Sequence, residues 1–245
     1  MKAMKDIPYR NTDDPSHRLD VYSPDEPAEG IIIYFYGGGF ESGSKEDLSF
    51  MNVLAERGYT LALPNYRLYP NARYPDYIED AASAVAWVVK RRKEFSESGK
   101  VILGGISAGA YLAMMLCFEK RWLGEHAIDP ESFAGFIFDA GQPTLHFNIL
   151  KEDGLPPTAV VVDERAPLFH VREGRICQPM LFICADDDIP GRYEQTLLMM
   201  ATLKAIGCED CVSFRYKRGF GHCAYVIEPD YLKDVENFAR NLKLD

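Results

Sequence analysis

The sequence predicts an α/β protein with a mostly parallel central sheet and helices on both faces. Strand-like and helix-like segments alternate along most of the 245 residues. Several strand-like segments, such as 31–36 and 101–106, are nearly continuous apolar runs, which is typical of parallel strands buried on both faces. No repeat, low-complexity tract or linker divides the chain, so we expect one domain over residues 1–245.

Each element follows from hydrophobic periodicity and from the residues that break it. Residues 17–22 alternate polar and apolar side chains, as an edge strand does, and the β-branched and aromatic run 31–36 predicts a central strand. The other predicted strands are 60–64, 101–106, 133–138, 179–185 and 212–216, and the predicted helices are 45–57, 76–97, 108–117, 192–206 and 230–242.

Residues 141–177 form the one irregular section of this pattern. We expect part of this segment to lie over the mouth of a site at the strand ends rather than within the sheet. The segment is too short and too polar to form a large apolar lid, so the sequence predicts a small cap or none.

Charge and cysteine content restrict the classes of partner and cofactor. The chain has 27 Lys and Arg against 37 Asp and Glu, a formal net charge of −10, and nucleic acid and anionic membrane surfaces both repel an acidic protein. No apolar segment follows the basic residues at the N-terminus, which argues against a signal peptide. Six scattered cysteines are then typical of reduced thiols in a cytoplasmic protein. No zinc or dinucleotide motif is present, so we expect no metal and no redox cofactor.

The pentapeptide Gly105-Ile-Ser-Ala-Gly109 lies between a predicted strand and a predicted helix. In that context a G-x-S-x-G motif forms a sharp turn, in which small neighbours let the chain reverse direction without collisions. The serine then stands exposed at the start of the helix. We therefore predict that Ser107 is a catalytic nucleophile.

A serine nucleophile needs a general base, and that base needs a carboxylate to orient it. His222 lies in a glycine-flanked loop after the last predicted strand, from which an imidazole can reach the strand ends. Three candidate acids, Asp186, Asp187 and Asp188, follow the predicted strand 179–185. Asp186 is favoured as the first residue beyond that strand, which leaves the other two as solvated or helix-capping residues.

The negative oxygen of a tetrahedral intermediate needs N–H donors that are fixed before the reaction begins. Gly37, Gly38 and Gly39 follow a central strand and supply backbone amides there. The amide of Ala108, beside the nucleophile, supplies another. These amides are the predicted oxyanion hole.

Five segments occur in the order and spacing of the α/β-hydrolase superfamily, namely Tyr36-Gly-Gly-Gly-Phe40, Asn65-Tyr-Arg-Leu68, Gly105-Ile-Ser-Ala-Gly109, Asp186-x-x-Ile-Pro190 and Gly221-His222. More narrowly, the chain resembles the esterase/lipase branch with its hormone-sensitive-lipase-like carboxylesterases and bacterial feruloyl and acetyl-xylan esterase-like proteins. The resemblance implies a triad of Ser107, Asp186 and His222. It also implies an oxyanion hole made by the amides of Gly38, Gly39 and Ala108.

Tyr36 departs from the family pattern, which usually has His before the three glycines. In prolyl-oligopeptidase-like relatives, a Tyr at a similar place lends its hydroxyl to the oxyanion. Tyr36 is therefore a candidate oxyanion donor, and packing in support of the loop is its alternative role.

The resemblance implies a serine carboxylic-ester hydrolase that forms an acyl-enzyme with a small-molecule ester. The lack of a large lid predicts short-acyl or aryl esters, with acylated carbohydrates among the candidates, rather than long-chain lipids. Peptidase and arylformamidase activities use the same triad and stay open, as does a non-catalytic binding module on this fold. A phosphate-binding interpretation fails because Ser44 precedes Lys45, which reverses the P-loop order. The sequence leaves open whether the chain forms a homodimer.

Overall fold

The computed structural model describes residues 1–172 and 176–242. Within these residues, eight strands form one sheet in the order β1-β2-β4-β3-β5-β6-β7-β8. The strands are β1 (Lys2–Pro8), β2 (Arg18–Ser23), β3 (Gly30–Phe35), β4 (Tyr59–Pro64), β5 (Val101–Ile106), β6 (Gly135–Asp139), β7 (Met180–Asp187) and β8 (Val212–Gly221). Neighbours from β4 to β8 pair in parallel, whereas β2 pairs antiparallel with both β1 and β4. The predicted fold class is confirmed.

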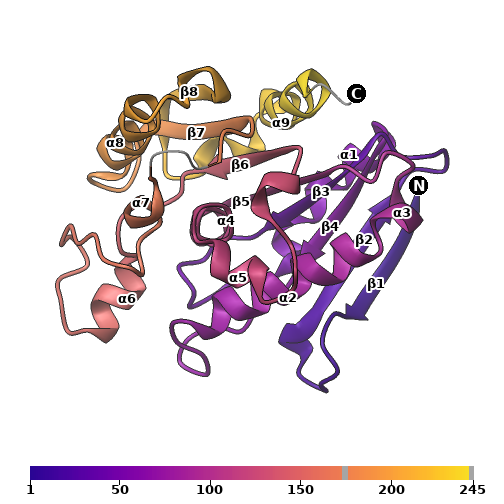
Figure 1. Ribbon diagram of the computed structural model, residues 1–245, viewed down its shortest axis with the longest axis horizontal. Coiled ribbons are helices and arrows are strands. Elements are labelled where there is room, and N and C mark those ends of the chain that lie inside the picture. The colour runs from indigo at the N-terminus through magenta and orange to yellow at the C-terminus, as the bar shows by residue number, and fades with distance from the viewer. Residues whose placement is uncertain (173–175, 243–245) are drawn as a thin grey trace.

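Helices cover both faces of this sheet (Figure 1). They are α1 (Val53–Glu56), α2 (Asp76–Lys90), α3 (Arg92–Phe95), α4 (Ala108–Phe118), α5 (Lys120–Gly124), α6 (Phe147–Glu152), α7 (Pro167–His170), α8 (Arg192–Ala205) and α9 (Pro229–Asn241). The short 3-10 helices are η1 (Pro15–His17), η2 (Lys45–Asn52), η3 (Pro130–Ser132), η4 (Glu209–Cys211) and η5 (Ala224–Ile227). Helices α2, α4 and α5 pack against one another on one face. On the other face, Arg57, the residue after α1, forms an ion pair with Glu236 of α9.

The centre of the molecule is the unit formed by β3, β5 and α4. Every residue of β3 and of β5 is buried, as the apolar runs in the sequence predict. Helix α4 follows β5 directly and is also buried along its whole length. The turn between β5 and α4 therefore lies between two fully buried elements, where side chains have little freedom to move.

The structure differs from the local predictions in several places, including β8, which was expected to end at residue 216 and continues to Gly221. Strand β1 was not expected, because its residues are nearly all exposed and it pairs only with β2 at the sheet edge. The helix expected over 45–57 is a 3-10 helix, η2, followed by the single turn of α1. The helix expected over 76–97 ends at Lys90, and α3, which follows it, buries no side chain that could hold the two in one continuous helix.

None of the helices in the described ranges is both long enough and apolar enough to span a bilayer. The segment 141–177, which the sequence left irregular, contains the short helices α6 and α7. Neither helix belongs to the layers that cover the central strands (Figure 1).

Candidate active site

Ser107 occupies the strained turn between β5 and α4. Its backbone has φ 54° and ψ −116°, a region that residues other than glycine rarely adopt. A Cβ atom on Gly105 would lie 2.4 Å from the backbone of Gly109, and one on Gly109 would lie 2.2 Å from the carbonyl oxygen of Phe35. Glycine is therefore required at both ends of the pentapeptide, as the predicted turn demands.

The imidazole of His222 lies directly beside this serine. The Nε2 atom of His222 is 2.8 Å from the Oγ atom of Ser107, although the two residues are 115 positions apart in the chain. His222 follows the last residue of β8, Gly221, and its side chain is a quarter exposed. The structure thus brings together two of the three side chains that the sequence singles out.

The third side chain in contact is Asp188 and not Asp186. The Oδ1 atom of Asp188 is 2.6 Å from the Nδ1 atom of His222, and the Asp188 side chain is only 1% exposed. Asp186 is exposed, and its carboxylate accepts a hydrogen bond from the Gly219 amide at 2.7 Å. The preference for Asp186 is corrected accordingly.

The physical reason for this correction is the length of β7. The sequence-based boundary at 185 makes Asp186 the first residue beyond the strand, but β7 continues to Asp187 through its pairing with β8. Asp188 is therefore the first residue beyond the strand. Pairing between two strands that are distant in sequence sets this boundary, so the apolar run alone could not reveal it.

The loop after β3 lies against the nucleophile. A Cβ atom on Gly37 would be 3.0 Å from the Cβ atom of Ser107, so this backbone passes directly beside the serine. Gly38 and Gly39 have φ values of +101° and +65°, which favour glycine. Among the described residues, neither of these two amides donates to a protein acceptor. Ala108 begins α4, where the first amides of a helix have no partner within the helix.

Tyr36 holds this loop from the core side. Its ring stacks on that of Tyr66 with 4.4 Å between centroids, and its hydroxyl donates to the carbonyl oxygen of Tyr66 at 3.3 Å. The Tyr66 hydroxyl donates in return to the Tyr36 carbonyl oxygen at 2.9 Å. Burial raises the pKa of Tyr36, so its hydroxyl remains protonated. These contacts correspond to the alternative role of Tyr36, which is to support the glycine loop by packing.

An apolar cavity of about 370 Å³ adjoins the site. It is lined by Gln142, Phe147, Pro157, Thr158, Ala159, Val160, Ile189, Pro190, Gly191, Arg192 and Gln195. Phe147 links the cavity to the glycine loop, because a Cβ atom on Gly39 would lie 2.7 Å from its ring. Ile189 links the cavity to the side of the site that holds the triad acid, because Ile189 directly follows Asp188.

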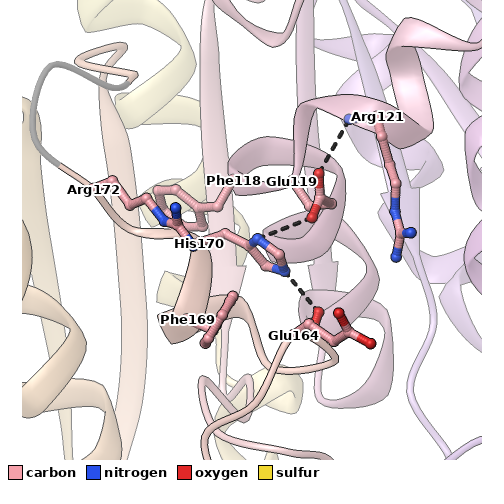
Figure 2. A pocket seen from close by; sticks show the side chains of 7 residues that line it. All are labelled: Phe118, Glu119, Arg121, Glu164, Phe169, His170 and Arg172. Carbon is pink, nitrogen blue, oxygen red and sulfur yellow. Dashed lines mark hydrogen bonds and ion pairs between the residues drawn. The ribbon is translucent and has the colours of Figure 1, made fainter.

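A second cavity, of about 240 Å³, lies at the far end of α4 and contains none of the residues above (Figure 2). His170 lies in it between two acceptors. Its Nδ1 atom is 2.9 Å from Oε2 of Glu119, and its Nε2 atom is 2.7 Å from the carbonyl oxygen of Glu164. His170 therefore ties the segment 141–177 to the end of α4, which is a structural role.

The chemistry available at the site follows from these distances. With the imidazole proton on Nδ1 and directed at Asp188, the Nε2 lone pair faces the Ser107 hydroxyl and can accept its proton. Within residues 1–172 and 176–242, no group of His, Cys, Asp and Glu is arranged to hold a metal ion. The arrangement suits nucleophilic attack by a serine on a carbonyl carbon.

Comparisons of the sequence relate the chain to known esterases. The BD-FAE family model matches residues 19–133. Probable carboxylesterase 6 from Arabidopsis thaliana is 35% identical in an alignment of length 241 that covers 88% of this chain and 70% of that protein. Kynurenine formamidase from Danio rerio is 29% identical over 139 residues, 56% of this chain and 45% of that protein. Three further curated esterases match this chain over only 26% to 32% of their own length.

Comparisons of the structure give the same fold over nearly the whole chain. Esterase B from Lactobacillus rhamnosis has a TM-score of 0.80 at 16% identity, over 98% of this chain and 84% of that one. A truncated carbohydrate esterase from gut microbiota also has a TM-score of 0.80, at 18% identity, over 98% of this chain and 96% of that one. Taken with the sequence matches, these likenesses show that the chain belongs to the esterase branch of the α/β-hydrolase superfamily.

Proposed function

We propose that this protein is a serine carboxylic-ester hydrolase in which Ser107 is the nucleophile, His222 the general base and Asp188 the orienting acid. The observation that carries the proposal is the continuous contact from Ser107 through His222 to Asp188, at 2.8 and 2.6 Å. Those are hydrogen-bond distances, so a proton can move from the serine to the imidazole without rearrangement of the site.

The reaction then has two halves. As the Oγ atom of Ser107 attacks the ester carbonyl, His222 takes the hydroxyl proton and then gives it to the leaving alcohol. This leaves an acyl group on the serine. A water molecule then attacks the acyl carbonyl while His222 takes one of its protons. His222 gives this proton to the Oγ atom of Ser107 as the acyl–oxygen bond breaks, which releases the acid and restores the serine and the neutral imidazole.

Asp188 serves this cycle by holding the imidazole in one tautomer. Its carboxylate accepts the Nδ1–H proton, which keeps the Nε2 atom free to act as the base. It also stabilises the imidazolium that forms when His222 takes the serine proton. Burial of the Asp188 side chain strengthens both effects, because water screens the interaction less there.

The oxyanion hole consists of the amides of Gly38, Gly39 and Ala108. Support comes from the close approach of the glycine loop to Ser107 and from the lack of protein acceptors for the Gly38 and Gly39 amides in the described part of the chain. Donors fixed in advance stabilise the tetrahedral intermediate without a cost of reorganisation.

The substrates are short-acyl or aryl esters. Two features support this choice, namely the apolar cavity of about 370 Å³ and the small size of the segment 141–177, whose described residues form only two short helices, α6 and α7. The likeness to a gut carbohydrate esterase makes acylated sugars, in which the sugar is the alcohol component, reasonable esters to test. We also propose a cytoplasmic location, on the basis of the scattered cysteines.

Hydrolysis of p-nitrophenyl acetate by the wild type and by Ser107→Ala tests the proposal. Loss of a serine nucleophile lowers turnover on the order of a millionfold in a comparable hydrolase, so the variant should fall to the background rate. A wild-type rate no higher than that of Ser107→Ala would instead favour a non-catalytic binding module.

A second candidate function is arylformamide hydrolysis, which the match to a kynurenine formamidase favours. The same triad cleaves a formamide if His222 protonates the leaving amine. A direct comparison of kcat/KM on phenyl acetate and on formanilide separates the two activities. The larger value identifies the preferred bond.

A further inference from the structure

A buried carboxylate lies beneath the proposed active site, at the end of β6. Asp139 has no exposed surface. Its Oδ2 atom accepts a hydrogen bond from the Tyr231 hydroxyl at 2.8 Å, and its Oδ1 atom accepts one from the Tyr225 hydroxyl. The hydroxyls of Tyr231 and Tyr34 are 3.0 Å apart. Three tyrosines from β3, η5 and α9 thus form one network with this carboxylate.

The main chain of Asp139 contacts the nucleophile turn. Its carbonyl oxygen accepts a hydrogen bond from the Ser107 amide at 2.8 Å. This bond continues the parallel pairing in which Asp139 lies opposite Ile106. One residue therefore holds the strained turn of Ser107 with its carbonyl oxygen and the tyrosine network with its side chain.

Tyr225 carries the connection from this network to His222. It lies three residues after the histidine and is fully buried, while Cys223 between them has a left-handed φ of 58°. The Tyr225 ring also packs edge-on against Phe220, two residues before the histidine, with 6.3 Å between centroids. The loop that presents His222 is therefore fixed on both sides by a single buried side chain.

The charges around Asp139 make the tyrosine hydrogen bonds important. The pKa of Asp139 is raised to about 7, mainly by burial and also by the nearby charge of Asp188, against the opposing effects of the Tyr225 and Tyr231 hydroxyls and of Lys217. Burial also raises the pKa of both tyrosines, so that they remain donors. A buried carboxylate destabilises the fold unless hydrogen bonds satisfy its oxygens. Loss of either tyrosine hydrogen bond therefore costs free energy, and this cost keeps the two hydroxyls fixed on Asp139.

We propose that Asp139 is a positioning residue, which holds His222 over Ser107 by fixing the Tyr225 hydroxyl while its own carbonyl oxygen fixes the nucleophile turn. The inference rests on the proposed hydrolase function. It adds to the triad a further carboxylate, that of Asp139, which contacts neither the substrate nor the imidazole. Its effect on the reaction passes through the placement of the histidine loop.

The decisive variant is Tyr225→Phe, which removes only the hydroxyl that Asp139 holds and leaves the ring to pack. We expect kcat for p-nitrophenyl acetate to fall about tenfold with KM unchanged, because misplacement of a base affects the transition state rather than binding. Tyr59→Phe is the matched control. Tyr59 is equally buried but begins β4 at the opposite end of the sheet, so its loss of a hydroxyl should leave kcat at the wild-type value.

Two further variants measure how much the other members of the network contribute to kcat. Tyr231→Phe removes the other donor to Asp139 and should lower kcat less than Tyr225→Phe does, because Tyr231 lies in α9 and not in the histidine loop. Asp139→Asn keeps the side-chain volume but leaves one tyrosine without an acceptor, and should lower kcat at least as much. If Asp139→Asn fails to fold, Tyr225→Phe alone decides the matter. A kcat for folded Tyr225→Phe equal to that of Tyr59→Phe would overturn the proposal.

A readout without substrate separates this proposal from the hydrolase proposal. Proton NMR of the free protein reports the His222 Nδ1–H proton in its hydrogen bond to Asp188. We expect this resonance to broaden by exchange with water in Tyr225→Phe but to stay sharp in Tyr59→Phe. An unchanged resonance in Tyr225→Phe would contradict the positioning role whether or not the wild type hydrolyses an ester.

Discussion

The Nδ1 atom of His222 lies 2.6 Å from the Oδ1 atom of Asp188, the first residue beyond β7. Asp186, two positions earlier, is bound instead to the amide of Gly219 across the β7–β8 pair. Two acids of the same type thus have different surroundings, one buried against the imidazole and one exposed near the end of β7. This difference makes the triad assignment testable by a matched pair of variants.

Asp188→Asn should lower kcat for p-nitrophenyl acetate on the order of ten-thousandfold, because the amide no longer selects the imidazole tautomer with a free Nε2 atom. Asp186→Asn makes the same chemical change at an exposed position and should keep at least a third of the wild-type rate. Steady-state kinetics on both folded variants check the pair. An equally large loss in Asp186→Asn would contradict the assignment of Asp188.

Gly39→Ala should lower kcat about a hundredfold or more, which is the typical cost of one lost oxyanion donor. The added Cβ atom would lie 2.7 Å from the Phe147 ring, so the loop and its amide must shift. Gly154→Ala is the matched control, because Gly154 has a similar φ of +71° but nothing within 4 Å of an added Cβ atom. Gly154→Ala therefore shows what the left-handed φ alone costs in urea unfolding, and any further loss of stability in Gly39→Ala comes from the contact with Phe147. If Gly39→Ala retains full activity, its amide is not an oxyanion donor.

Tyr36→Phe should keep kcat within about threefold of the wild type, since a lost oxyanion donor typically costs a hundredfold or more. The reason is that the hydroxyl donates to the Tyr66 carbonyl oxygen, on the core side of the loop. Kinetics on p-nitrophenyl acetate measure this directly. A hundredfold fall in kcat with normal stability would assign the hydroxyl to the oxyanion hole.

Butyryl esters of p-nitrophenol should be hydrolysed with a higher kcat/KM than palmitoyl esters. An acyl chain gains about 0.8 kcal/mol for each CH₂ group only where that group is buried. The cavity of about 370 Å³ and two short helices of segment 141–177 provide limited cover for a long chain. A series of acyl lengths below the critical micelle concentrations measures the trend, and a maximum at palmitoyl would refute it.

The stability of the wild type relative to Asp139→Asn should fall as pH rises from 5 to 8. Burial raises the pKa of Asp139 from 3.8 to about 7, so the folded chain binds this proton more tightly than the unfolded chain does. Raising the pH removes a proton that favours the folded form. The wild type should therefore lose about 3 kcal/mol relative to the variant across this range. Urea unfolding at both pH values measures it, and a difference that does not vary with pH would show that Asp139 has an ordinary pKa.

Ser107 and the glycines around it could be predicted from the sequence for a local reason. The strained turn, the glycines at either end and the strand and helix on each side all lie within residues 101–118. The fold class followed in the same way from apolar runs that are buried on both faces. His222 was predictable because glycines mark its loop and the last predicted strand precedes it.

The identity of the acid was decided by tertiary structure alone. Pairing with β8 extends β7 past its apolar residues to Asp187, and this extension turns Asp188 rather than Asp186 toward the histidine. The edge strand β1 was hidden for the related reason that only its pairing with β2 defines it. The network of Asp139 joins β3, β6, η5 and α9, and no local pattern marks it. Periodicity records which residues a chain buries, whereas contacts between distant segments depend on how those buried faces pack together.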